Sequence, residues 1–582
     1  MTLFKIIILS LSVLLTVPGF SAPSEAEYVK LSETWNLLPD GSQEYRCYKE
    51  LTLFTHTAMN GTYGETFIVY NPLFQELKIH DSYTRQKDGT LIRTPENAFV
   101  EVLPRNAEKA PAYNHLKEMV IVHTGLELGA TLVLDYSILS KPGYLPALDV
   151  CRQLNQSSPV REYQLAFNLP AGIAAHYTTL GIEQEPGQIT SADIRHYKWI
   201  FRNLKAASRE PQVQLQNGDV PALLFHTFAS PQETAQTLGR QFDSPSAVAQ
   251  LAERLTKNAS GEKEKLQAIH QYILTQVDHC HLSLSESGFR LRPAAQVIQT
   301  AYGTDIEKIN LLSALLNAAG IPAIPAAACS VAADPADCGL QTMGELLVVA
   351  EAAGKTYRLN TRSFQPAAVG CNFIVNLTDG NVLPCKQEPA HLRYQADIQW
   401  KEGKNEAKVK ATFTDNYLSY APDFAQELLA VRTDRTVTGE NETTTVNGNT
   451  TAPVSAQQDY LILTLPQTHK GILQEQGYHR FNSKRTVNLL LPNVLTEEYD
   501  YTLRLPADLT LCTPEKEITL NNAAGSLHIS LRQEGQDVHI RRTLDLPERL
   551  ITPDNYPAFR QLITEWADPQ GQQLLLKKSP EK

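Results

Sequence analysis

The stretch GTDIEKINLLSALLNAAGIPA, residues 303–323, predicts a helix that is buried on nearly every side. Its apolar residues leave little polar face, which is typical of a core helix. Thr304 and Glu307 have the spacing of a capping box, and Asp305 in the first turn suits the helix dipole. A Gly-Ile-Pro sequence ends the helix. A helix start framed in this way often carries a catalytic cysteine, but this one contains none.

The residues on either side predict the rest of a helix-plus-hairpin core. Upstream, GEKEKLQAIHQYILTQV places Leu266, Ile269, Ile273 and Val277 on one helical stripe. Downstream, ELLVVAEAAGKTYRLNTRS predicts a β-hairpin that turns around residues 352–354. A helix and a hairpin in this order can assemble a Cys–His–Asp set. The helix dipole then favours a thiolate at the helix start, and the hairpin supplies the base and its carboxylate.

Strand-forming sequence flanks this core on both sides. Runs such as ETFIVYNP and EMVIVHTGLELGATLVLDYSIL predict an N-terminal β-sandwich. Strands return near residue 388, and YPAFRQLITEWA predicts a last helix. The polar segment 438–455, TGENETTTVNGNTTAPVS, lacks periodicity and predicts a mobile loop. We therefore expect a multidomain α+β protein with a β-sandwich at residues 23–235, a helix-plus-hairpin core at 244–387 and a C-terminal β domain at 388–582.

The N-terminus has the layout of a secretory signal peptide. Lys5 precedes an apolar run over residues 6–17, and a Pro-Gly pair and small residues follow it. The run is shorter than the roughly 20 residues of a membrane span. The alternative is an uncleaved N-terminal anchor. We expect residues 1–22 to be removed and the mature protein to be exported, soluble, and periplasmic or extracellular.

The net charge and the cysteine content indicate which ligands and which cellular compartment to expect. The net charge of −11 and the lack of a basic stripe argue against nucleic-acid binding. Eight cysteines without a CxxC pair fit an oxidising compartment and give no zinc ribbon. Cys329 with Cys338, and Cys371 with Cys385, are close enough in sequence to close small loops. We expect at least one of these pairs to be a disulfide, although 105 complete pairings of eight cysteines are possible.

Several sequence segments resemble those of a family of bacterial exported proteins. GTDIEK stands where bacterial transglutaminase-like cores have a Gly-Asp-Cys-Lys-Asp-Lys signature, and LLSALLNAAGIPA resembles the helix that follows it. RLRPAAQVIQTAYG resembles the usual lead-in segment. YNPLFQELKIHDSYTRQKDGTLI and NHLKEMVIVHTGLELGATLVLDY resemble the domain of unknown function 3857, and DNYPAFRQLI resembles the β domain that commonly follows such cores. The resemblance covers nearly the whole chain after the signal segment, and it implies a papain/transglutaminase-like core.

The resemblance places other residues where the family has its catalytic triad. The cysteine position falls on Asp305, the histidine position on Glu345 and the aspartate position on Asn360. No histidine occurs between His281 and His391, so the hairpin supplies no imidazole base in any register. We therefore expect a pseudoenzyme with a degenerate triad, no catalytic residue, no cofactor and no bound metal. Its groove is expected to hold an extended peptide or a cell-envelope component.

Two alternatives stay open. Asp305 and Glu345, if adjacent, would raise one another's pKa; such a pair could bind Ca²⁺ or serve as the acid and base of a hydrolase or transferase. DHCH places His279 and His281 on one face of a strand, where two imidazoles could face a metal. No third ligand is evident, so packing or surface exposure is the favoured interpretation.

Overall fold

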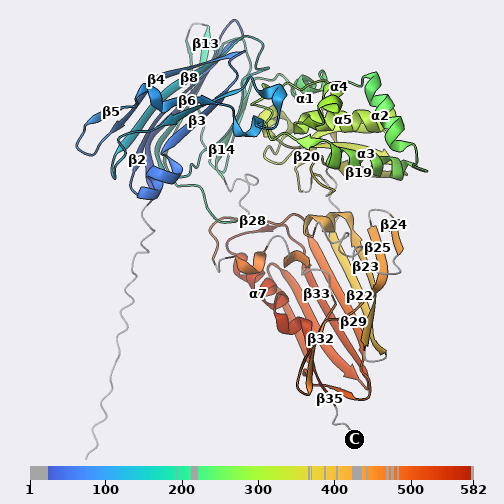
Figure 1. The fold of residues 1–582 in the computed structure, drawn as a ribbon. Coiled ribbons are helices and arrows are strands. Elements are labelled where there is room, and N and C mark those ends of the chain that lie inside the picture. Colours follow the sequence, from blue (N-terminus) through green and yellow to red (C-terminus); the bar gives the residue numbers. More distant parts are fainter. Residues whose placement is uncertain are drawn as a thin grey trace, which may run out of the picture.

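The structure of the protein is a computed structural model. It describes residues 24–578 apart from residues 192, 212–219, 365–366, 369, 384, 386–388, 402–403, 422–435, 441–442, 467–470, 474–476 and 482–483. The signal peptide expected at residues 1–22 lies outside the described residues. A β-rich N-terminal part, a helical central part and a C-terminal β part follow one another along the chain (Figure 1). None of the helices in the described ranges is long and apolar enough to cross a membrane.

The N-terminal part is a β-sandwich, as expected. Its strands are β1 (Ala26–Leu37), β2 (Gln43–Leu53), β3 (Glu65–Tyr70), β4 (Gln75–Arg85), β5 (Leu91–Arg93), β6 (Phe99–Val102), β7 (Lys117–Val122), β8 (Thr131–Ser140), β9 (Asp149–Gln153), β10 (Val160–Pro170), β11 (His176–Leu180), β12 (Gly187–Ser191), β13 (Ile194–Leu204) and β14 (Ala222–His226). The large sheet has the order β12-β13-β10-β1-β2-β8-β4-β5, and β11-β14-β9 and β3-β7-β6 pack on it. Stacked aromatic rings fill the core, with the centroids of Phe167 and Phe225 3.9 Å apart.

The central part is built around the predicted buried helix. Its helices are α1 (Pro231–Gly239), α2 (Ser246–Thr256), α3 (Glu262–Gln276), α4 (Ala294–Thr300) and α5 (Asp305–Ala318), and its strands are β15 (Asp278–His279), β16 (Tyr302–Gly303), β17 (Ala323–Cys329), β18 (Met343–Ala352), β19 (Lys355–Leu359), β20 (Phe373–Asn376) and β21 (Val382–Leu383). Every residue of α5 from Ile306 to Leu316 is buried. The helix contacts β17 and β18 of the sheet β19-β18-β17-β20-β21, and α2, α3 and α4 surround it. The hairpin β18–β19 turns at Ala353-Gly354, both with positive φ, as the sequence predicts.

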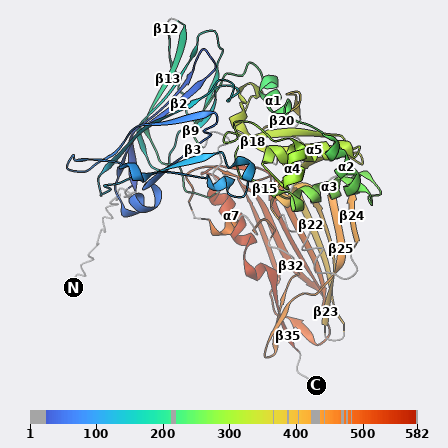
Figure 2. The ribbon, with the colours of Figure 1, turned by 45° about the horizontal axis from the view of Figure 1, so that its top comes forward.

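The C-terminal part is a second β domain. Its strands are β22 (Ala390–Lys401), β23 (Lys404–Thr414), β24 (Thr436–Glu440), β25 (Thr443–Thr450), β26 (Val454–Gln457), β27 (Tyr460–Thr464), β28 (Leu489–Leu490), β29 (Leu495–Arg504), β30 (Leu509–Leu511), β31 (Lys516–Asn522), β32 (Gly525–Glu534), β33 (Asp537–Leu546), β34 (Leu550–Ile551) and β35 (Gln573–Lys578). The large sheet runs β24-β25-β23-β22-β29-β33-β32-β31, and β26-β27-β35-β30 forms a smaller one. The expected last helix is α7 (Tyr556–Trp566), which lies along the large sheet in Figure 2.

The mobile loop predicted for residues 438–455 is wrong, because much of this segment forms strands. β25 pairs along its length with β23, and β24 pairs with β25 at the edge of the sheet. Val446 and Gly448 are buried, whereas Asn447 between them and Thr445 before them are half-buried. The alternation is hidden in the sequence, since glycine and threonine carry little of an apolar pattern.

Candidate functional site

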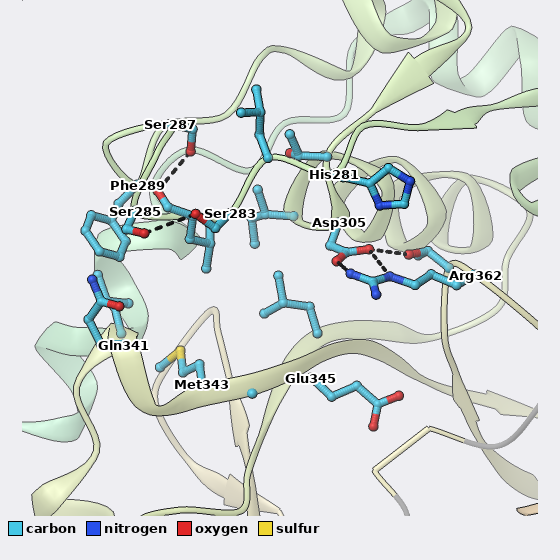
Figure 3. Close-up of a pocket in the computed structure, with 18 of the residues that line it drawn as sticks. His281, Ser283, Ser285, Ser287, Phe289, Asp305, Gln341, Met343, Glu345 and Arg362 are labelled. Carbon is cyan, nitrogen blue, oxygen red and sulfur yellow. Dashed lines mark hydrogen bonds and ion pairs between the residues drawn. The ribbon is translucent and has the colours of Figure 1, made fainter. Parts of the chain in front are cut away.

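A groove with a volume of about 540 Å³ opens beside the N-terminus of α5. Its lining comes from four segments, residues 281–289, 304–306, 340–346 and 360–362. Asp305, His281 and Arg362 lie together at one end, and Phe289, Gln341 and Met343 lie at the other (Figure 3). The groove therefore has a charged end at the start of the helix and a more apolar end beside β18.

Asp305 is held by Arg362 in a two-point ion pair. The Arg362 Nε donates to Asp305 Oδ1 over 3.0 Å, and a terminal guanidinium nitrogen donates to Oδ2. This bidentate geometry is the strong form of a carboxylate–arginine pair. The hydrogen bond to Asp305 raises the pKa of Arg362, so the guanidinium stays charged. Both oxygens of Asp305 are thereby engaged by a cation.

Two histidines lie beside Asp305, although the hairpin has none. β15 pairs in parallel with β16, and this brings His279 opposite Gly303, just before α5 begins. His279 Nδ1 is 3.5 Å from Asp305 Oδ1, and the His279 and His281 ring centroids are 4.5 Å apart. Burial lowers the pKa of His279 to about 4, so its imidazole is neutral at pH 7. Sequence reasoning missed this placement, because a two-residue parallel bridge leaves no periodic signal.

Glu345 does not meet Asp305 as the alternative of a carboxylate pair requires. It accepts the Ala368 N–H over 2.7 Å, and in Figure 3 its side chain does not point toward Asp305. Within the described ranges no hydrogen bond joins the two carboxylates. Burial raises the pKa of Glu345, while the Ala368 N–H opposes the shift. The described residues also contain no group of three His, Cys, Asp or Glu side chains arranged to hold a metal ion.

Asn360 shapes the turn that carries Arg362 into the groove. Its Oδ1 accepts the N–H groups of Arg362 and Ser363 over 2.7 and 2.8 Å. Its backbone carbonyl accepts from His270 Nε2 over 2.8 Å, which ties the turn to α3. Asn360 thus positions Arg362, which in turn binds Asp305.

Glu307 forms a fully buried network behind the groove. The predicted capping box is present, with the Thr304 N–H donating to Glu307 Oε2 over 2.9 Å. Both the backbone N–H and the Nε of Arg292 donate to Oε1 over 2.9 Å, and the hydroxyl of Tyr113 donates to Oε1 over 2.6 Å. Tyr113 comes from the N-terminal sandwich, so α5 is fastened to both domains. The sequence predicts the cap but not these distant partners.

The N-terminal sandwich also contacts both walls of the groove, which are formed by residues 281–289 and residues 340–346. Beside the first wall, the Arg290 guanidinium lies 4.5 Å from the ring centroid of Phe74 and donates to Gly143 O over 3.2 Å. In the second wall, Asp149 on β9 accepts the Gln341 N–H over 3.0 Å. His226 Nε2 meets Ala336 O over 2.9 Å in the loop that leads into this wall. The groove lies in the central part, but its shape depends on contacts from the first domain.

One edge of β18 is open to the groove. β17 pairs with β18 from Met343 to Ala350, whereas β19 pairs only with Val348–Ala352. Among the described residues, the first half of β18 therefore has a strand partner on one side only. Gly344 lies in this half and lines the groove. A Cβ added there would meet only Ala328 O, at 3.9 Å. Gly344 is exposed at this edge, whereas Met343 and Leu347 are buried.

The predicted cysteine pairs are also brought together. Cys329 Sγ and Cys338 Sγ are 2.8 Å apart, and both residues are buried. A hydrogen bond between Cys371 and Cys385 raises the pKa of the Cys371 thiol. Both pairs lie beside the strands that form the floor of the groove.

Comparison with known proteins gives the family. The domain of unknown function DUF3857 matches residues 39–208, the transglutaminase-like superfamily matches residues 249–335, and DUF3858 matches residues 460–576. A crystal structure of a "putative protease" from Parabacteroides distasonis ATCC 8503 is 36% identical to this chain. It covers 95% of this chain and 99% of its own, with a TM-score of 0.77. The chain belongs to this family, in which a DUF3857 domain, a transglutaminase-like core and a DUF3858 domain follow one another.

Two further comparisons add nothing to this assignment. Legionella pneumophila aminopeptidase A, crystallised with aspartic acid, is 6% identical over 40% of this chain and 27% of its own. Its TM-score of 0.19 supports no inference. Among curated proteins, none matches the sequence.

Proposed function

We propose that the groove binds an extended peptide and performs no covalent chemistry on it. The observation that carries this proposal is the ion pair at the start of α5. A carboxylate is a weaker nucleophile and a weaker base when each of its oxygens accepts a charge-assisted hydrogen bond, and Arg362 donates to both oxygens of Asp305. The position of the family's base is taken by Glu345, which is bound to the Ala368 N–H instead. On this proposal the transglutaminase-like core is degenerate, with Asp305, Glu345 and Asn360 in structural roles.

The open half of β18 supplies a way to hold the peptide. An extended chain can add a strand to a free sheet edge, where main-chain hydrogen bonds give affinity and alternate side chains enter pockets. Gly344 leaves room for this chain, and the almost wholly buried side chains of Leu340, Met343 and Phe289 line the groove beside it. The Asp305–Arg362 pair at the other end would face polar groups of the same peptide.

The test is peptide binding with a blocked groove. Random peptides displayed on phage would be selected against the protein, and the binders measured against Gly344→Tyr. Gly187→Tyr in β12 is the matched control, because its Cβ also meets one backbone oxygen only, Lys198 O at 3.7 Å. We expect Gly344→Tyr to weaken binding at least tenfold and Gly187→Tyr to leave it unchanged. Equal binding by all three proteins would place the peptide elsewhere and contradict the proposal.

The second candidate is a hydrolase or transferase that uses Asp305 and Glu345. The name of the Parabacteroides distasonis protein and the raised pKa of Glu345 favour it. A turnover screen with peptides, amine donors and cell-wall fragments, analysed by mass spectrometry, separates the two candidates. Products formed by the unmodified protein and not by the Asp305→Asn, Glu345→Gln double variant would replace our proposal with this one.

We also propose that the protein acts outside the cytoplasm on peptides or other components of the cell envelope. The support is the signal-like N-terminus and the cysteine content. Mass spectrometry of the mature protein should find an N-terminus near residue 23. Limited proteolysis should cut near residue 388, the proposed boundary before the C-terminal β domain. An N-terminus at Met1 in the mature protein would leave an uncleaved anchor as the better explanation.

A further inference from the structure

We propose that Cys329 and Cys338 form a disulfide that fastens one wall of the groove. Cys329 is the last residue of β17, and Cys338 follows a short helical turn at Pro335–Asp337. Their sulfurs are 2.8 Å apart, less than 1 Å longer than the roughly 2.05 Å of a disulfide bond. Because the sulfurs are already this close, no large movement of either residue is needed to join them. Cys329 is fully buried and Cys338 is 2% exposed.

Three of the other cysteines lie elsewhere in the protein. Cys47 is buried in the N-terminal core, Cys280 Sγ contacts Asn106 O at 3.8 Å, and Cys512 is exposed in the C-terminal domain. Cys371 lies near both Cys385 and Cys329, because Phe373, two residues further on, pairs with Cys329. A bond from Cys329 to Cys371 is therefore the competing arrangement, and Cys371 with Cys385 is the second bond that our pairing leaves possible.

The bond would close the loop of residues 330–337, which leads into the groove wall. Leu340 and Gln341 follow shortly after Cys338 and line the groove. Asn372 Nδ2 donates to Ser330 O and Ala332 O over 3.0 and 2.9 Å at one end of the loop. Asp149 accepts the Gln341 N–H beyond the other end. The disulfide lies between these two contacts, and the loop that it encloses also meets the N-terminal domain through His226 Nε2 at Ala336 O.

The chemistry is thiol–disulfide exchange during folding. The S–H bonds of Cys329 and Cys338 break and one S–S bond forms, which releases two protons and two electrons. A disulfide-bearing exchange protein takes them up and becomes a dithiol. The hydroxyl of Thr342 donates to Cys338 Sγ over 3.2 Å. Hydrogen bonds from Cys329 and from Thr342 lower the pKa of the Cys338 thiol, which makes Cys338 the better attacking group.

The pairing is tested without any ligand. Protein purified from an oxidising compartment would be alkylated, digested without reductant and mapped by mass spectrometry. The digestion must include a cut at Asp334 or Asp337, because no Lys or Arg lies between the two cysteines. We expect the two fragments from this cut to be joined through Cys329 and Cys338, and Cys512 to be alkylated. A Cys329–Cys371 linkage, or alkylation of Cys329 and Cys338 in the unreduced folded protein, would overturn the proposal.

The effect on the groove rests on the proposed function and is measured separately. Hydrogen exchange over residues 330–342 should rise at least tenfold in the Cys329→Ser, Cys338→Ser variant and stay unchanged in Cys512→Ser. Binding of the selected peptides should weaken in the same variant. Faster exchange with no selectable peptide would disprove the peptide groove and leave the disulfide intact. Unchanged exchange in a mapped disulfide protein would show that the bond does not fasten the wall.

Discussion

Two carboxylates on one turn of α5 have opposite environments. Asp305 lies in the groove, with 27% of its side chain exposed, and pairs with Arg362, whose side chain is 62% exposed. Glu307 is fully buried and pairs with Arg292, whose side chain is 11% exposed. Both residues follow the same N-cap and both bind an arginine. The comparison shows that the tertiary surroundings, and not the local sequence, decide which acid supports the fold and which lies at the groove.

The largest effect should come from Glu307→Ala. The change leaves the Arg292 guanidinium buried beside an empty site, and breaking a buried ion pair costs about 3–5 kcal/mol. Urea unfolding would measure it, with Glu253→Ala on the exposed side of α2 as the control. A loss below about 1 kcal/mol would mean that Arg292 finds water or another acceptor, and that the burial of Glu307 is less complete than its contacts suggest.

A third carboxylate, Asp149, has no arginine partner among the described residues. Burial raises its pKa from 3.8 to about 7, so its ionisation weakens the folded state. Stability from this group is therefore present below pH 4 and lost as the pH rises toward 7, by on the order of 2–4 kcal/mol. Unfolding measured from pH 4 to 8 should show a flatter pH dependence in Asp149→Asn than in the unmodified protein. Parallel curves would contradict the raised pKa.

Tyr113→Phe should have an intermediate effect on stability. It tests whether the N-terminal sandwich helps to hold the start of α5. It removes one hydrogen bond to the buried Glu307 carboxylate, which is worth about 1.5–3 kcal/mol. Thermal unfolding would detect the loss, and Tyr83→Phe on β4 serves as the control. An effect no larger than that of the control would show that the N-terminal sandwich does not help to fix the start of α5.

The smallest effect on stability should come from Asp305→Asn. Exposed ion pairs contribute about 0–1 kcal/mol, and Arg362 can turn into solvent when its partner loses charge. Urea unfolding of Asp305→Asn beside Glu307→Gln, the equivalent change two residues away, measures the contrast directly. Equal losses in the two variants would remove the distinction between the groove acid and the core acid.

Local pattern was enough for α5, the hairpin and the last helix. The capping residues and the near-continuous apolar run fix α5, and the alternation around Ala353-Gly354 fixes the hairpin. Local pattern did not predict β24 and β25, because these strands are polar. β25 is held in the sheet by its pairing with β23, and β24 by its pairing with β25. Local pattern also gave no sign of Arg362 beside Asp305, because the two residues are far apart in sequence and an ion pair leaves no periodic trace.

The sequence by itself determined the order of the β-rich and helical parts and the buried helix. Each of these depends on composition, on local periodicity or on motif spacing, which are properties of neighbouring residues. Only the tertiary structure decided that Arg362 and His279 meet Asp305, that Glu345 lies apart from it, and that the first domain holds both groove walls. These contacts join residues distant along the chain, so they exist only once packing has brought the separate elements together.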